Sequence, residues 1–149
     1  MPDVLVVDDH EAIRILCRTH LEDAGMRVIE ATDGVEALER AREHRPDVIL
    51  LDVMLPRLSG WEVAEALRGE PETANLPIIF ISAKASVWDI AHGLELGGLD
   101  YLTKPFDPST LAPVIRNLLA RIGRGERELV HAERLDAVSA RLASTPRKS

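Results

Sequence analysis

The chain has 149 residues, 46% of them hydrophobic and 3% aromatic, which is enough for one domain with an aliphatic core. Residues 1–122 hold 12 Lys and Arg against 21 Asp and Glu, an acidic balance that argues against direct nucleic-acid binding by this part, whereas residues 123–149 hold 6 against 4. The single cysteine, Cys17, excludes an internal disulfide, and no apolar stretch reaches the roughly 18 residues of a membrane span. We therefore expect a cytoplasmic protein without a membrane segment, in which Cys17 is a small buried residue.

Short β-branched runs alternate with segments of helical period along residues 1–122. Strands are predicted near 3–8, 27–31, 47–52, 77–82 and 99–103, and helices near 10–25, 34–44, 59–69, 86–96 and 107–122. Gly25 is expected to end the first helix, and Ser59 with Glu62 has the spacing of a capping box at the third. This alternation predicts an α/β fold with a doubly wound, five-stranded parallel sheet.

After residue 122 the alternation stops. Gly123 and Gly125 break the fifth predicted helix. Apolar residues then recur at helical spacing toward Pro146, at Leu129, Ala132, Leu135, Val138 and Leu142. We interpret residues 1–122 as one domain and residues 123–149 as a helical extension or linker that either pairs with another helix or packs back, with a disordered end at residues 144–149. The protein is then either a stand-alone domain or part of a longer chain.

Three carboxylates follow two of the predicted strands. Asp52 ends the apolar run Val48-Ile49-Leu50-Leu51, and Asp8 with Asp9 ends the run Val4-Leu5-Val6-Val7. Parallel neighbouring strands bring such acids together at their carboxyl ends, where open α/β sheets bind ligands. Because like charges at close range need a cation, and oxygen ligands suit Mg²⁺ better than zinc, the sequence predicts a magnesium site.

Four motifs stand at the ends of predicted strands: Val6-Val7-Asp8-Asp9, Leu51-Asp52-Val53-Met54-Leu55-Pro56, Ile81-Ser82-Ala83 and Asp100-Tyr101-Leu102-Thr103-Lys104-Pro105-Phe106. In this order they resemble the motifs of one known family, the response regulator receiver domains of two-component signalling. The resemblance covers about residues 3–122 and implies a flavodoxin-like (βα)5 fold with strand order 2-1-3-4-5.

By this resemblance, Asp52 is the phosphoacceptor, and Mg²⁺ is held by Asp8, Asp9, Asp52 and the backbone carbonyl of Met54. Ser82 and Lys104 contact the phosphoryl group, Ser82 and Tyr101 form the switch, and the peptide bond before Pro105 is cis. The phosphoryl donor is a sensor histidine kinase or a phosphotransfer protein, and the chain is a signalling domain rather than an enzyme. A carboxylate that attacks phosphorus gives a labile acyl phosphate, which suits a transient signal.

Each residue also has a simpler interpretation. Asp8 or Asp9 could cap the first helix. Ser82 could be an ordinary strand-end hydroxyl, and Lys104 a solvated amine. Tyr101 could fill the core, although a half-buried ring with its hydroxyl near solvent is the position that we expect. His10 is expected to be only an exposed residue at the start of a helix.

The output surface implied by the resemblance comprises the fourth predicted helix, the last strand and the fifth helix. Val87, Trp88 and Ile90 stand there where the family commonly has charged residues, and Leu99 stands where an acid is usual. We interpret these four residues as an exposed patch for a target or for a phosphorylation-dependent homodimer. The alternative is that the helix is rotated and buries Trp88.

Met54 and Lys84 each stand two residues after a predicted site residue, Asp52 and Ser82 respectively. Their long side chains would hinder an attacking water, which predicts a phosphoryl lifetime of minutes or longer.

Three other classes fit less well. A phosphohydrolase with an aspartyl nucleophile usually has a second Asp where this chain has Met54. A flavodoxin-like cofactor domain would not place acids in its first loop, because they repel phosphate. A receiver that binds partners without phosphorylation would be expected to have lost a key residue.

Overall fold

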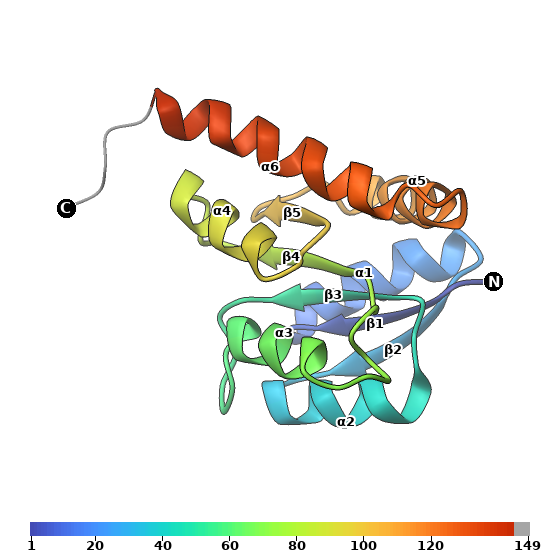
Figure 1. Cartoon of the computed structure of the whole chain (residues 1–149). Coiled ribbons are helices and arrows are strands. Elements are labelled where there is room, and N and C mark those ends of the chain that lie inside the picture. The colour runs from blue at the N-terminus through green and yellow to red at the C-terminus, as the bar shows by residue number, and fades with distance from the viewer. Residues whose placement is uncertain (145–149) are drawn as a thin grey trace.

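The computed structural model describes residues 1–144 and shows a parallel sheet with helices on both faces (Figure 1). The strands are β1 (Asp3–Val7), β2 (Arg27–Ala31), β3 (Val48–Asp52), β4 (Ile78–Ser82) and β5 (Asp100–Thr103). The helices are α1 (Glu11–Asp23), α2 (Gly34–His44), α3 (Gly60–Arg68), α4 (Val87–Glu95), the 3₁₀ turn η1 (Pro108–Thr110), α5 (Leu111–Gly123) and α6 (Arg127–Ala143). The strand order is β2-β1-β3-β4-β5, which confirms the predicted α/β, flavodoxin-like topology.

The strands alternate between two apolar cores. In β1, Leu5 and Val7 belong to the first core, which they share with residues of α2, α3 and α4, whereas Val4 and Val6 belong to the second core, which they share with residues of α1 and α5. This period of two is what a strand covered on both faces requires. Cys17 lies fully buried in the second core, as predicted.

The local signals agree with the observed ends of the helices. Gly25 has a φ of +84°, directly after α1, where a residue without Cβ is favoured. Ser59 and Glu62 form the predicted capping box at the start of α3. Gly60, the first residue of α3, has no room for a side chain, because a Cβ there would lie 2.7 Å from the Cα of Val53. The capping box and this close approach hold α3 against the end of β3.

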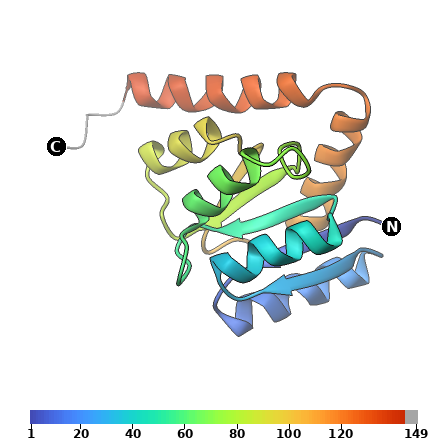
Figure 2. The same cartoon turned by 60° about the horizontal axis from the view of Figure 1, so that its bottom comes forward.

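Helix α6 folds back onto the sheet rather than extending away from it. It follows a turn at Gly125 (φ +78°) and lies along the β5 side of the molecule, over α4 and α5 (Figure 1; Figure 2). Val130 and Val138 are buried, one in each core, and Arg134 pairs with Asp100 of β5 at 3.4 Å. Of the two alternatives for the extension, this structure shows the one in which it packs back.

The buried stripe of α6 differs from the predicted one. Leu135 and Leu142 are half-buried and Val138 is buried, but Leu129 is 54% exposed and Ala132 is also exposed. The reason is that α6 faces its own domain through Val130 instead of Leu129, a rotation that periodicity alone leaves open.

The expectation of a disordered end lies almost entirely outside the described residues. None of the helices within residues 1–144 combines the length and hydropathy needed to cross a bilayer.

Candidate functional site

Two buried carboxylates face each other at the carboxyl ends of adjacent strands. Asp52 is the last residue of β3, and Asp8 follows β1, whose Val7 is paired with Leu51 of β3. Their exposed fractions are 2% and 0%. Buried charges of like sign need a cation close by.

The side chain of Lys104 supplies a positive charge between these acids. Its Nζ lies 2.6 Å from Asp8 Oδ2 and 3.2 Å from Asp52 Oδ2. Lys104 follows β5, its backbone N–H donates to the carbonyl of Ser82 at 2.8 Å, and the Lys104–Pro105 peptide bond is cis. The three groups come from three strand ends and form one ion-paired cluster.

Electrostatics around Asp52 disfavour its charged form. Burial raises the pKa of the Asp52 carboxyl above its ordinary value, and the Asp8 charge acts in the same direction, against the opposing effect of Lys104. Burial disfavours the Lys104 ammonium too, but the hydrogen bond to Asp8 and the Asp52 charge raise the pKa of Lys104 overall. The site therefore keeps its lysine charged while leaving Asp52 short of compensating positive charge.

Asp9 and His10 form the exposed side of the same cluster. His10 Nδ1 lies 3.1 Å from Asp8 Oδ1 and 3.2 Å from Asp9 Oδ1. One potential ligand atom from each of Asp8, Asp9, His10 and Asp52 lies within 4.8 Å of the others. The expectation that His10 is exposed and begins a helix is confirmed, since its side chain is 67% exposed and it is the N-cap of α1. Its contacts with both acids were missed, and its place directly after Asp9 was the available signal.

The simpler interpretation of the acids as helix caps does not describe this structure. The N-cap of α1 is His10, without a side-chain capping bond, and the backbone N–H of His10 donates to Asp8 Oδ1 at 2.9 Å. Three carboxylates with one exposed side fit a hard cation that keeps several waters, as Mg²⁺ does. The donor set is therefore compatible with the predicted metal.

The loop after β3 shapes the other side of Asp52. The backbone N–H of Met54 donates to Asp52 Oδ1 at 3.1 Å, and the side chain of Met54 is 55% exposed. A cavity of about 420 Å³ lies beside this loop, and its lining includes Met54, Trp61 and Lys84. Met54 and Lys84, which were expected to flank the site, therefore border one hollow beside the loop that follows Asp52.

Ser82 and Tyr101 are linked through the segment after β4. Ser82 is fully buried, and its Oγ accepts a hydrogen bond from the backbone N–H of Lys84 at 3.1 Å. The Tyr101 hydroxyl donates to the carbonyl of Lys84 at 2.6 Å. Tyr101 is 9% exposed, and its ring lies beside those of Phe80 and Trp61, with centroids 6.0 and 6.4 Å away. The expectation of a half-buried residue is wrong, because Tyr101 packs into the core beside Phe80 and Trp61. Its hydroxyl bonds the carbonyl of Lys84, which is an exposed residue.

The predicted partner patch is not one exposed surface. Leu99 is 2% exposed and Ile90 is 9% exposed, and both belong to the cores. Val87 is half-buried against the first core, and Trp88, with 36% of its surface exposed, is the only one of the four residues that is exposed. The physical reason is that α4 turns Ile90 toward the sheet, while Leu99 packs with α5 and Val130 of α6. The rotation proposed as the alternative, which would bury Trp88, is not observed either.

Comparisons with known proteins agree with this geometry. The response regulator receiver domain family matches residues 4–116. The DNA-binding dual master transcriptional regulator RpaA of Synechocystis is 38% identical over 91% of this chain and 56% of its own length. The alkaline phosphatase synthesis transcriptional regulatory protein PhoP of Bacillus subtilis is 46% identical over 79% of this chain and 48% of its own length. The chain thus spans about half the length of these relatives.

Solved structures show the same fold. The receiver domain of the Francisella response regulator 1452 has a TM-score of 0.77 and 37% identity, covering 82% of this chain and 99% of its own. The chemotaxis response regulator CheY4 of Vibrio cholerae has a TM-score of 0.74 at 37% identity, covering 78% of this chain and 98% of its own.

The doubly wound sheet, with an acidic cluster and a lysine at its carboxyl edge, has the architecture of a signalling receiver domain. The chain belongs to the response regulator receiver domain family of two-component signalling. Such domains accept phosphoryl groups from histidine kinases, typically bind Mg²⁺ at an acidic pocket, and act in signalling rather than as ordinary enzymes.

Proposed function

We propose that Asp52 of this chain accepts a phosphoryl group from a histidine kinase or a phosphotransfer protein. The observation that carries the proposal is the cluster of Asp8, Asp52 and Lys104, in which a buried carboxylate has one basic partner and another acid beside it. A carboxylate oxygen of Asp52 attacks phosphorus, the bond from phosphorus to the donor's nitrogen or oxygen breaks, and that atom leaves with its electron pair.

The surrounding residues prepare this transfer. Lys104, already held 3.2 Å from Asp52, is placed to neutralise charge on the phosphoryl oxygens. Asp8, Asp9 and Asp52, with the Met54 carbonyl, would hold Mg²⁺, and His10 lies beside them. When bound, Mg²⁺ supplies further positive charge for the developing transition state. The Ser82 hydroxyl would turn from the Lys84 N–H toward the new phosphoryl oxygens.

The response is proposed to reach the face formed by α4, β5 and α5. Ser82 and Tyr101 both bond to Lys84, so a movement of this segment changes the Tyr101 contact and the start of α4. In this chain α6 lies over that face. The signal must therefore pass through α6 or displace it before a homodimer or a target can use the face. The acidic balance of residues 1–122 makes a protein surface a more suitable target than nucleic acid.

The proposal is tested by intact-mass measurement after incubation with acetyl phosphate. We expect one phosphoryl group to be added in the presence of Mg²⁺, none in EDTA, and none with Asp52→Asn. Asp107→Asn is a matched control, because Asp107 is an exposed acid that caps η1 away from the cluster. Phosphate release without an adduct would favour the hydrolase class. A wild-type chain that gains no phosphoryl group from acetyl phosphate or from a phosphorylated histidine kinase would refute the proposal.

A further inference from the structure

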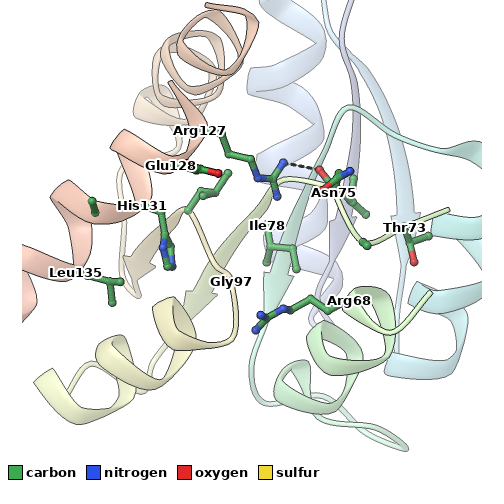
Figure 3. A pocket seen from close by; sticks show the side chains of 13 residues that line it. Arg68, Thr73, Asn75, Ile78, Gly97, Arg127, Glu128, His131 and Leu135 are labelled. Carbon is green, nitrogen blue, oxygen red and sulfur yellow. Dashed lines mark hydrogen bonds between the residues drawn. The ribbon is translucent and has the colours of Figure 1, made fainter. Parts of the chain in front are cut away.

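A second cavity, distinct from the hollow beside Met54, lies far from Asp52, at the opposite edge of the sheet. Its volume is about 410 Å³, and it opens between α6 and the amino end of β4 (Figure 3). Ile78, which begins β4, lies at its base, whereas the proposed switch residue Ser82 ends the same strand. Cavities of this size are typical of small-molecule sites.

The cavity has an apolar base and a polar rim. Buried Ile78 and Leu99 lie at the base, with half-buried Leu76 and Leu135 beside them. The polar part of the lining includes three basic side chains from two helices, Arg68 from α3 and Arg127 and His131 from α6 (Figure 3). A ligand with an apolar body and a charged group matches such a lining.

The two arginines are bound only by backbone carbonyls within residues 1–144. Arg127 Nη1 donates to the carbonyl of Asn75 at 2.6 Å, and Arg68 Nη1 donates to the carbonyl of Glu95 at 3.2 Å. Neither has a carboxylate within ion-pair distance in this part of the chain, although other arginines of the same region, Arg121 and Arg134, do. A guanidinium has five N–H donors, so each arginine keeps donors that these bonds do not use.

Charge at this rim is unusual for so acidic a protein. The net charge of the chain is −7, yet two guanidinium groups lie at one cavity, and neither forms an ion pair with an acid within residues 1–144. Burial lowers the pKa of Arg127, and no carboxylate opposes that effect. The imidazole Nε2 of His131 is hydrogen-bonded to the carbonyl of Leu94 in α4 at 2.6 Å.

We infer that this cavity is a binding site for a small organic anion, with a carboxylate or phosphate held by Arg68 and Arg127 and an apolar body on Ile78, Leu99 and Leu135. The site does not depend on the proposed phosphorylation, because its residues are distinct from the acidic cluster. Since one arginine belongs to α3 and the other to α6, a bound anion joins α6 to the domain. Ligand binding thereby strengthens the cover that α6 places over the α4-β5-α5 face.

The carboxylate of Glu128 repels an anion and therefore weighs against this inference. It also lines the cavity, at an exposed position next to Arg127. An anion must therefore bind against one carboxylate, which predicts that Glu128→Gln binds the anion more tightly than the wild type does. An apolar ligand without charge is the competing occupant, and it should be indifferent to Glu128.

The test compares octanoate, 1-octanol and octylamine, titrated into the full unphosphorylated chain and followed by two-dimensional amide NMR. We expect octanoate to shift the resonances of Ile78, Gly97 and His131, and the other two probes to bind at least about tenfold more weakly. Arg127→Gln and Arg68→Gln should each weaken octanoate binding by about tenfold, the loss of one charge-assisted hydrogen bond. Arg116→Gln is the control, since Arg116 of α5 also bonds a carbonyl, that of Ala24, but lies outside the cavity.

The outcomes separate the possibilities clearly. Equal binding of octanoate and 1-octanol would reduce the cavity to an apolar hollow and overturn the anion site. Shifts confined to other residues, or no saturable shift with any probe, would overturn it as well. Because Arg127→Gln could loosen α6, the effect of Arg68→Gln, on a different helix, must agree with it for the inference to stand. None of these results depends on whether Asp52 accepts a phosphoryl group.

Discussion

Tyr101 is the only tyrosine of the chain, so its ionisation can be followed directly by absorbance near 295 nm. Burial raises the pKa of its hydroxyl to about 12 from the ordinary 10.0, and the neighbouring Ser82 hydroxyl only partly opposes this. The contribution of this hydroxyl to the free energy of unfolding is fully present below about pH 10 and is lost between pH 10 and 12. The reason is that only the unfolded phenol ionises in that range. We expect a titration midpoint near 12 in the folded chain and near 10 in urea. A folded midpoint near 10 would place the hydroxyl in solvent.

Asp52 is the residue at which stability and function compete. A carboxyl whose pKa rises on folding lowers stability above its unfolded pKa, because the unfolded carboxyl gives up its proton more readily. Without metal at pH 7, Asp52→Asn should therefore raise the melting temperature, by about 3 °C if ~1 kcal/mol is recovered. The gain should shrink as the pH falls below the ordinary value of 3.8, and Mg²⁺ should stabilise the wild type more than the variant. A melting temperature that falls at pH 7 would contradict this account.

A substitution of Met54 tests the predicted long lifetime of the phosphoryl group. The side chain of Met54 and Lys84 border a hollow beside the loop that follows Asp52, and we expect an attacking water to enter from there. Met54→Asn should hydrolyse its acyl phosphate about two- to tenfold faster, a change of up to ~1.4 kcal/mol in the barrier. The decay of the phosphorylated mass after removal of acetyl phosphate measures this rate. Equal decay in both proteins would exclude shielding by Met54.

At the scale of elements, α3 is the helix that fixes the loop carrying Met54. Gly60 begins it, and a Cβ there would lie 2.7 Å from the Cα of Val53 and closer still to the Asp52 carbonyl. Gly60→Ala should cost about 1–3 kcal/mol in urea unfolding and slow phosphorylation, because the end of β3 must move. Gly69→Ala is the matched control, since its Cβ would meet nothing closer than 3.6 Å and should stay within ~0.5 kcal/mol. Equal effects of the two changes would show that the close approach is unimportant.

The positions of helices and strands could be predicted from local sequence signals more reliably than the contacts between them. The strand at 27–31 and the helix at 34–44 were predicted to the residue, because turn residues and periodicity change sharply at their ends. The fifth helix was predicted from 107, whereas η1 and then α5 at Leu111 are observed. Asp107 caps the 3₁₀ turn there, and nothing in a periodic pattern separates such a turn from the helix that follows.

At the scale of the whole molecule, α6 decides which surfaces are available. Val138→Asp places a charge in the first core and should release α6 at a cost of about 2 kcal/mol, seen as faster hydrogen exchange of the α6 amides. Ser139→Asp, at the exposed neighbouring position, should leave exchange unchanged. If phosphorylation also displaces α6, the released variant should self-associate without acetyl phosphate. Unchanged exchange in Val138→Asp would show that α6 is held by its polar contacts alone.

The sequence by itself determined the sheet, its five βα units and the acids at its carboxyl edge, because burial on both faces and strand-end chemistry are written in short, local patterns. It determined neither the contacts of His10, nor the bond of Tyr101 to the Lys84 carbonyl, nor the burial of Leu99. The contacts of His10 are local but depend on how its ring is oriented, whereas those of Tyr101 and Leu99 depend on residues farther along the chain. The burial of Leu99 depends in part on the rotation of α6, which an amphipathic pattern constrains only weakly. Only the tertiary structure therefore brought Arg68 and Arg127 to one cavity and placed α6 over the α4-β5-α5 face.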